Sequence, residues 1–175
     1  MTTGYMPDTN VFSDVLDGRV GIERLRTHRL YATHIQRDEI GKTRDEARRE
    51  ALLAIFNELM ADMTPTSSAV AGVSVANAAC AGESVVPTEA AVWDVSKWGY
   101  AKWGNGGSEF DRLRRALDER NKGTRNNVQD VLIAQTALRN GMSLLTRDAD
   151  LMSAAKEFGV PCEDATVVFG ITDAG

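Results

Sequence analysis

The stretch that decides the fold is "NVQDVLIAQTALRNGMSLLTRD", residues 127–148. Within it Asp130, Ile133, Ala134 and Ala137 stand at positions i, i+3, i+4 and i+7, which places them on one face of a predicted helix. A helix that turns this face to the core carries a carboxylate with it. That carboxylate needs a partner, because the helix dipole contributes only about 0.3–1 kcal/mol against the cost of burial.

Both ends of this helix can be read from the sequence. Asn127 is a residue type that caps helices, Arg139 suits the last turn, and Gly141 can take the left-handed conformation that ends a helix. Residues 142–146, MSLLT, then predict a short buried strand.

The rest of the chain continues this alternation. The predicted strands are 30–32 and 166–169. The predicted helices are one opened by the capping box 33–36, a longer one opened by the box 43–46, one from Ser108 towards Arg120 and one at 151–158. The longer helix carries an apolar stripe at Leu52, Ile55, Phe56, Leu59 and Met63. Alternating helices and strands predict an α/β fold with a mainly parallel sheet.

Composition limits the class of protein. The 175 residues suit one domain, and a net charge of −5 with a pI near 5.1 argues against a broad basic surface. Cys80 and Cys162 give neither a disulfide framework nor metal-ligand spacing, and residues 1–15 do not resemble a signal peptide. We therefore expect a cytoplasmic protein with no membrane partner.

Residues 64–108 differ in composition from the rest and predict an insertion in the single domain 1–175. They are rich in Ala, Gly, Ser and Val and hold all three tryptophans, Trp93, Trp98 and Trp103. The tryptophans suit a small satellite core or a subunit interface, and stacking on nucleic-acid bases is the alternative.

Acidic residues recur where predicted strands give way to helices. Asp8 in "MPDTN" and Asp148 in "LLTRD" both stand at such a junction, and the carboxyl ends of parallel strands are where α/β folds build sites. Glu39 lies in the helix opened by Thr33. Each has an ordinary interpretation as a helix cap or a solvated side chain.

Taken together, these motifs resemble the PIN-domain nucleases, which include the VapC-type toxins of bacterial and archaeal toxin–antitoxin pairs. The resemblance covers residues 5–60 and 109–170, and its most specific part is the block from Asp130 through "LLTRD". It implies a three-layer α/β/α sandwich and metal-dependent cleavage of RNA. An antitoxin protein and a second copy of the chain are candidate partners. The pattern departs from the family at Pro7 and in the length of segment 64–108.

The resemblance also assigns residues. It implies that four carboxylates bind Mg²⁺ or Mn²⁺ and carry catalysis, namely Asp8, Glu39, Asp130 and Asp148. It places Asn10 and Thr146 as polar supports of that site. Basic side chains near these positions are candidates for RNA binding: Lys42, Arg44, Arg125 and Arg147.

Physical chemistry agrees with a shared metal. Converging carboxylates repel one another by about 1–4 kcal/mol for each close pair, and hard oxygen ligands favour Mg²⁺ or Mn²⁺ over zinc. A haloacid-dehalogenase-like phosphatase would need a second aspartate at position 10, where this chain has Asn10. The remaining alternative is a catalytically silent PIN-like module that binds RNA or protein.

Overall fold

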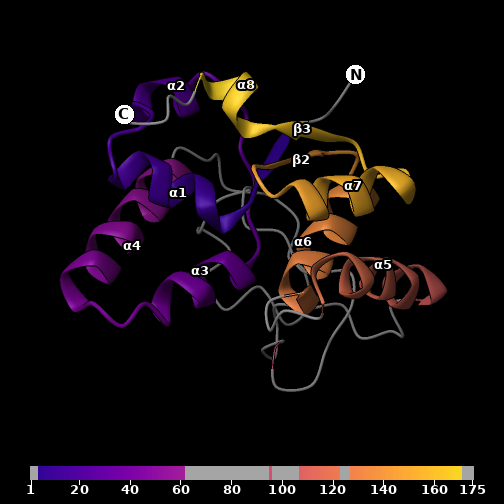
Figure 1. The fold of residues 1–175 in the computed structure, drawn as a ribbon. Helices are drawn as coiled ribbons and strands as arrows, with labels where there is room; N and C mark the ends of the chain where they lie inside the picture. The colour runs from indigo at the N-terminus through magenta and orange to yellow at the C-terminus, as the bar shows by residue number, and fades with distance from the viewer. Residues whose placement is uncertain (1–3, 62–94, 96–106, 123–126, 171–175) are drawn as a thin grey trace, which may run out of the picture.

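The computed structural model describes residues 4–61, 95, 107–122 and 127–170 (Figure 1). The elements in chain order are β1 (Tyr5–Pro7), α1 (Thr9–Leu16), α2 (Ile22–Arg26), α3 (His34–Gly41), α4 (Glu46–Ala61), α5 (Gly107–Asn121), α6 (Asn127–Arg139), β2 (Ser143–Thr146), α7 (Ala149–Glu157), β3 (Cys162–Asp164) and α8 (Ala165–Phe169). Among these helices, none combines the length and the apolar character that crossing a bilayer requires. The three tryptophans of the predicted insertion lie outside the described residues.

The three named strands form one parallel sheet in the order β1-β2-β3, which confirms the predicted α/β class. Leu144 of the central strand β2 is opposite Met6 on one side and Cys162 on the other. Because all three strands point the same way, their carboxyl ends meet at one edge of the sheet. We call this the carboxyl edge.

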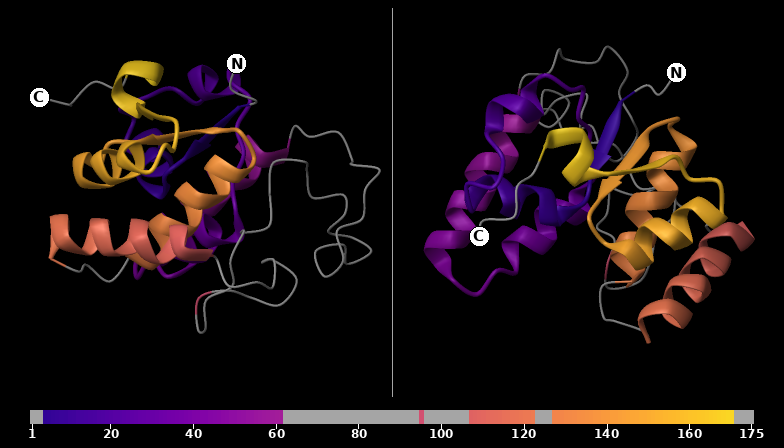
Figure 2. Two further views of the ribbon diagram at one scale, coloured as in Figure 1. Left: turned by 90° about the vertical axis from the view of Figure 1, so that its right-hand side faces the viewer. Right: turned by 45° about the horizontal axis from the view of Figure 1, so that its top comes forward.

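Helices cover both faces of the sheet, an arrangement compatible with a three-layer α/β/α sandwich. Figures 1 and 2 show α1, α3 and α4 on one side and α5, α6 and α7 on the other. Successive side chains of β2 point to opposite faces. Leu144 accordingly packs into a core with α5, α6 and α7, and Leu145 into a second core with α1, α2 and α4.

Several local predictions are confirmed. Thr33 caps α3, and its backbone N–H donates to Oε1 of Gln36 at 2.9 Å, which completes the predicted capping box. Gly141 has φ of 66°, and the N–H of Met142 returns to the carbonyl of Ala137 at 2.9 Å. These bonds end α6 and direct the chain into β2, as the glycine predicts.

One strand prediction is wrong and another is met only in part. Residues 30–32 form no named strand, but Leu30 and Ala32 are bridge residues, and Leu30 pairs in parallel with Tyr5 at the free side of β1. Residues 166–169 form α8 rather than a strand, because the strand has already run through residues 162–164. Oδ1 of Asp164 then accepts the N–H of Thr166 at 2.7 Å and caps the turn into α8. This cap overrides the strand preference of the β-branched residues that follow.

Two cap predictions are also wrong. Asn127 is the first residue of α6 and not its cap, and its side-chain oxygen accepts Nδ2 of Asn121 at 2.6 Å. In the second predicted box the cap is Asp45, whose Oδ1 accepts the N–H of Arg48 at 2.8 Å, and not Thr43. The helix α4 therefore begins at Glu46.

Candidate metal centre

Two of the four predicted carboxylates follow neighbouring strands at the carboxyl edge. Asp8 comes directly after β1, and its N–H continues the ladder by donating to the carbonyl of Leu145 at 2.7 Å. Asp148 follows β2 by one residue. The side chain of Asp8 caps α1 and that of Asp148 caps α7. The same two side chains thus cap helices and are the candidate metal ligands.

Asp8 is buried and accepts three hydrogen bonds. Its Oδ1 accepts the N–H of Thr9 at 2.6 Å, and its Oδ2 accepts Nδ2 of Asn10 at 3.2 Å and Oγ1 of Thr146 at 3.1 Å. The Thr146 hydroxyl in turn accepts the N–H of Asp148 at 3.0 Å. Asn10 and Thr146 therefore contact Asp8 directly, and Thr146 joins it to the turn that carries Asp148.

Only one of the two carboxylate oxygens of Asp148 caps α7. Oδ1 accepts the N–H groups of Asp150 and Leu151, at 2.8 and 3.0 Å, and so satisfies the free donors at the start of α7. Oδ2 takes no part in this cap. One carboxylate can therefore anchor the helix and still present an oxygen to a ligand.

Glu39 reaches the same place from α3. Its Oε2 accepts the hydroxyl of Thr9 at 2.5 Å, and Thr9 is the residue after Asp8. Burial raises the pKa of Glu39, and the nearby charge of Asp8 raises it further, whereas the Thr9 hydrogen bond and Lys42 lower it. Glu39 is thus close enough to Asp8 for the two charges to oppose each other.

Asp130 has a strongly raised pKa. It lies in the first turn of α6, half-buried, and within the described residues its carboxylate makes no hydrogen bond or ion pair. Burial, and then the charges of Asp8, Glu39 and Asp148, raise its pKa to about 8. The charges of the other three carboxylates therefore all act on Asp130, and we call the four together the acidic centre.

The pKa of Asp8 is also affected by a neighbouring carboxylate. Burial raises its pKa, and so does the charge of Asp148, while its three hydrogen bonds lower it. Among the described residues, no cation lowers the pKa of Asp8 or Asp130, whereas Lys42 lowers that of Glu39. A cation at the acidic centre would remove the repulsion.

The donor set fits a hard divalent cation better than zinc. It consists of carboxylate oxygens with nearby hydroxyl and amide groups, and Asp130 supplies a half-buried carboxylate that no described hydrogen-bond donor satisfies. As placed, no three His, Cys, Asp or Glu side chains of the described residues stand close enough together to chelate one ion. Oxygens of Asp8 and Glu39 are instead turned to their donors. Binding an ion would exchange some of these hydrogen bonds for metal contacts.

The predicted RNA-binding side chains have different environments. Lys42 and Arg44 are exposed near the end of α3, and Arg125 lies outside the described residues. Nη1 of Arg147 contacts Oδ1 of Asp14 at 2.7 Å. Of these basic residues, Arg147 is therefore held in place by a described ion pair.

Two residues at the site were not predicted from the sequence. Thr9 holds Glu39, and Asp14 holds Arg147. Nothing in a single sequence marks Thr9, because threonine is common in the first turn of helices. Asp14 does carry a signal, since it lies three residues after the buried Val11 and so interrupts the apolar face of α1.

Comparison of the chain with protein-family models, with curated proteins and with solved structures finds no match in any of the three.

Proposed function

We propose that the protein is a PIN-like, Mg²⁺- or Mn²⁺-dependent endoribonuclease that hydrolyses phosphodiester bonds in RNA. The observation that supports this most is the electrostatic coupling of four carboxylates from four separate segments, two of which follow neighbouring strands at the carboxyl edge. Assembling like charges costs free energy in the folded state, and a divalent cation is the partner that offsets this cost. The local motifs around these residues support the PIN-like assignment.

The bound cation would lower the pKa of a water molecule and stabilise charge on the phosphate. Asp8 and Asp148 are fixed by their cap hydrogen bonds, so they are ligands with little freedom to reorient. Asp130, whose pKa is raised to about 8, would be favoured in its ionised form by a cation bound beside it. Thr146 keeps Asp8 and the Asp148 turn at a constant separation.

The cellular role follows from the same resemblance and belongs to the same proposal. The chain would act in the cytoplasm as the toxin of a toxin–antitoxin pair, with a small antitoxin protein and a second copy of itself as partners. Cleavage of a panel of tRNA, rRNA and mRNA fragments would identify its substrate.

A catalytically silent PIN-like module that binds RNA or protein is the second candidate. One observation favours it: the described carboxylates are not placed closely enough for three of them to share an ion. The two candidates differ in whether Mn²⁺ binds at the acidic centre and RNA is cut.

The test is cleavage of labelled RNA by the full chain with Mg²⁺, with Mn²⁺ and with chelator. Asp130→Asn is the cleanest variant, because the amide replaces a carboxylate with no described hydrogen bond. We expect it to lower the cleavage rate by about 100-fold or more, since each lost 1.4 kcal/mol of stabilisation is tenfold. Asp150→Asn is the matched control, an exposed carboxylate in the first turn of α7.

The remaining carboxylates make supporting variants with different demands on the fold. Asp148→Asn retains a side-chain oxygen for the cap, and Glu39→Gln is close in shape. Asp8→Asn places an amide among three donors, so its folding must be checked by melting. Wild-type cleavage rates in both Asp130→Asn and Asp148→Asn would exclude a nuclease centre here and leave the binding module.

A further inference from the structure

Asp14 is a carboxylate buried within α1, away from the acidic centre's own hydrogen bonds. Its side chain is 3% exposed. Burying an ionised carboxylate is costly unless cations compensate it, and two arginines do so here. The question is why one buried acid holds two guanidinium groups.

The two arginines come from different parts of the chain and bind the same oxygen. Nη1 of Arg147 lies 2.7 Å from Oδ1 of Asp14, and Nη1 of Arg19 lies 3.1 Å from it. Because both nitrogens touch one atom, the two guanidinium groups are within reach of a single further anion. We call Arg19 and Arg147 the arginine pair.

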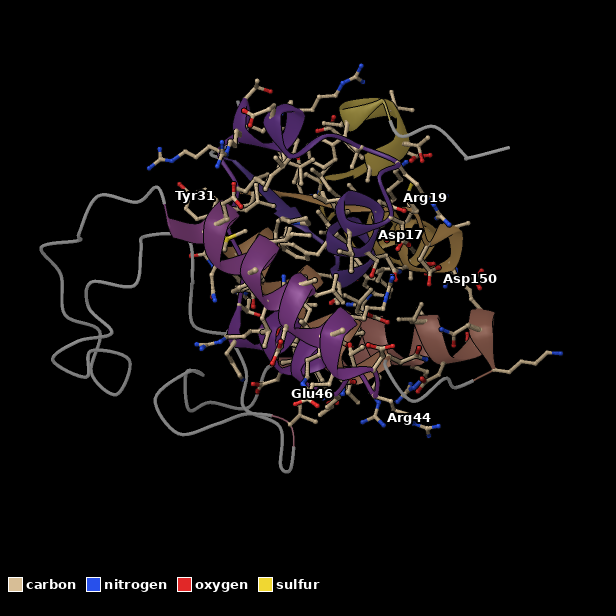
Figure 3. All side chains as sticks on the ribbon, turned by 90° about the vertical axis from the view of Figure 1, so that its left-hand side faces the viewer. Asp17, Arg19, Tyr31, Arg44, Glu46 and Asp150 are labelled. Carbon is tan, nitrogen blue, oxygen red and sulfur yellow. The ribbon has the colours of Figure 1, made fainter. Side chains whose placement is uncertain are left out.

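Backbone contacts fix both members as well. The N–H of Arg19 donates to the carbonyl of Asp14 at 2.9 Å, so the turn after α1 folds back onto the carboxylate. Arg147 stands between Thr146, whose hydroxyl donates to Asp8, and Asp148, which caps α7. The arginine pair is therefore attached to the edge of the acidic centre. Figure 3 shows Arg19 on the same side of the molecule as Asp150 in the first turn of α7.

Each arginine keeps donors beyond this contact. A guanidinium group has five N–H donors, so its contact with Oδ1 of Asp14 occupies only part of the set. The side chains of Arg19 and Arg147 remain 38% and 27% exposed, so both can be reached from solvent. Guanidinium groups match the oxygens of a phosphate in geometry and charge.

We propose that Asp14 positions Arg19 and Arg147 as a binding site for one backbone phosphate of the nucleic-acid strand that enters the acidic centre. This inference rests on the proposed function for its substrate. A lone structural role for the ion pairs is the competing explanation, under which the arginines tie α1 to the 146–148 turn and contact no ligand.

The test is binding rather than cleavage. Labelled single-stranded RNA and DNA of one sequence are titrated with the full chain carrying Asp130→Asn in Mn²⁺, with fluorescence anisotropy as the readout. Into this background go Arg19→Gln and Arg147→Gln. The controls are Arg26→Gln, an arginine in an ion pair with the same 38% side-chain exposure as Arg19, and Arg120→Gln, matched to Arg147 at 27%. Arg120 pairs with Glu157 at the far end of α7.

We expect Arg19→Gln and Arg147→Gln each to weaken binding by about three- to tenfold and the controls to leave it unchanged. The slope of log K against log salt should fall by about 0.7 for each lost contact, because a phosphate contact releases counterions from a single strand. RNA and DNA should lose affinity equally, since a phosphate is common to both. Inorganic phosphate should compete more weakly with the two variants than with their parent.

The outcomes separate this inference from the proposed function. Arginine variants that bind and respond to salt like their controls overturn the phosphate site, even if the wild type cuts RNA. Failure of the wild type to cut RNA, with selective loss of binding in the arginine variants, overturns the nuclease and keeps the phosphate site. Arg19→Gln decides the matter alone if Arg147→Gln does not fold, because Arg19 is the more exposed of the two. Absence of any oligonucleotide binding by the parent overturns the phosphate site.

Discussion

The hydroxyl of Thr9 donates a 2.5 Å hydrogen bond to Oε2 of Glu39. Thr9 begins α1 beside Asp8, and Glu39 lies in α3, so one contact connects two segments that carry the acidic centre. Glu39 has three side-chain torsions and would otherwise have many orientations available. The threonine selects the orientation that points to the centre.

We predict that Thr9→Val weakens Mn²⁺ binding by about 10–100-fold, the usual effect of removing a hydrogen bond that orients a metal ligand. Thr9→Ser should bind like the wild type, because it keeps the hydroxyl. Isothermal titration calorimetry measures both. Equal affinities of the Val and Ser variants would show that Thr9 does not orient Glu39 for a cation.

The pKa of Asp130 predicts how the metal-free stability depends on pH. The folded-state pKa of about 8 lies above the ordinary value of 3.8, so the folded protein holds this proton more tightly than the unfolded chain. The resulting contribution to stability is fully present below about pH 4 and is lost as the pH rises through about 8. In chelator, the melting temperature of the wild type should therefore fall from pH 6 to pH 9 by more than that of Asp130→Asn. Parallel curves for the two proteins would contradict the perturbed acidity.

Metal should reverse the order of stability between the wild type and Asp148→Asn. Without metal the amide relieves repulsion from Asp8, by about 1–3 kcal/mol at an effective dielectric near 20, and raises the melting temperature by a few degrees. With excess Mn²⁺ the wild type gains binding free energy that the variant lacks, so the variant should melt lower. Asp150→Asn should follow the wild type in both conditions. If wild type and Asp148→Asn melt at the same temperature with and without Mn²⁺, the carboxylates of Asp8 and Asp148 are not close together.

Asp14→Asn should lower the free energy of unfolding by about 1–3 kcal/mol, the range for hydrogen bonds to charged groups. The loss stays moderate because both arginines can turn to solvent. Asp17→Asn is the matched control: Asp17 directly follows α1, is exposed and pairs with Arg48. Urea unfolding of both variants measures the difference. Equal stability of the two would mean that Asp14 is compensated by groups other than the arginines.

Local chemistry explains which predictions from sequence were right. The capping box at Thr33 and the glycine at 141 act through atoms a few residues apart, so their patterns are sufficient to identify them. The α/β class follows from the alternation of elements. The proximity of Asp8 and Asp148 was also expected, because they follow neighbouring parallel strands whose carboxyl ends meet at one edge.

Contacts between distant residues explain what the sequence could not provide. The pairs Thr9–Glu39 and Asp14–Arg147 depend on how α1 lies against α3 and β2. The error at 166–169 has a similar origin. Thr166 and the two valines after it favour a strand, yet β2 pairs with residues 162–164 and Asp164 then turns the chain.

The bond from Thr146 to Asp8 spans 138 positions of sequence, and it has a consequence for the order of events during synthesis. β1 emerges from the ribosome well before its neighbour β2, which follows on the order of ten seconds later at about 5–20 residues per second. Until residue 130 is made, the nascent chain holds Asp8 and Glu39 alone; Asp130 follows with α6, and Asp148 comes last, after β2. The acidic centre can thus assemble only after residue 148 has emerged, so premature termination before that point yields a chain without it.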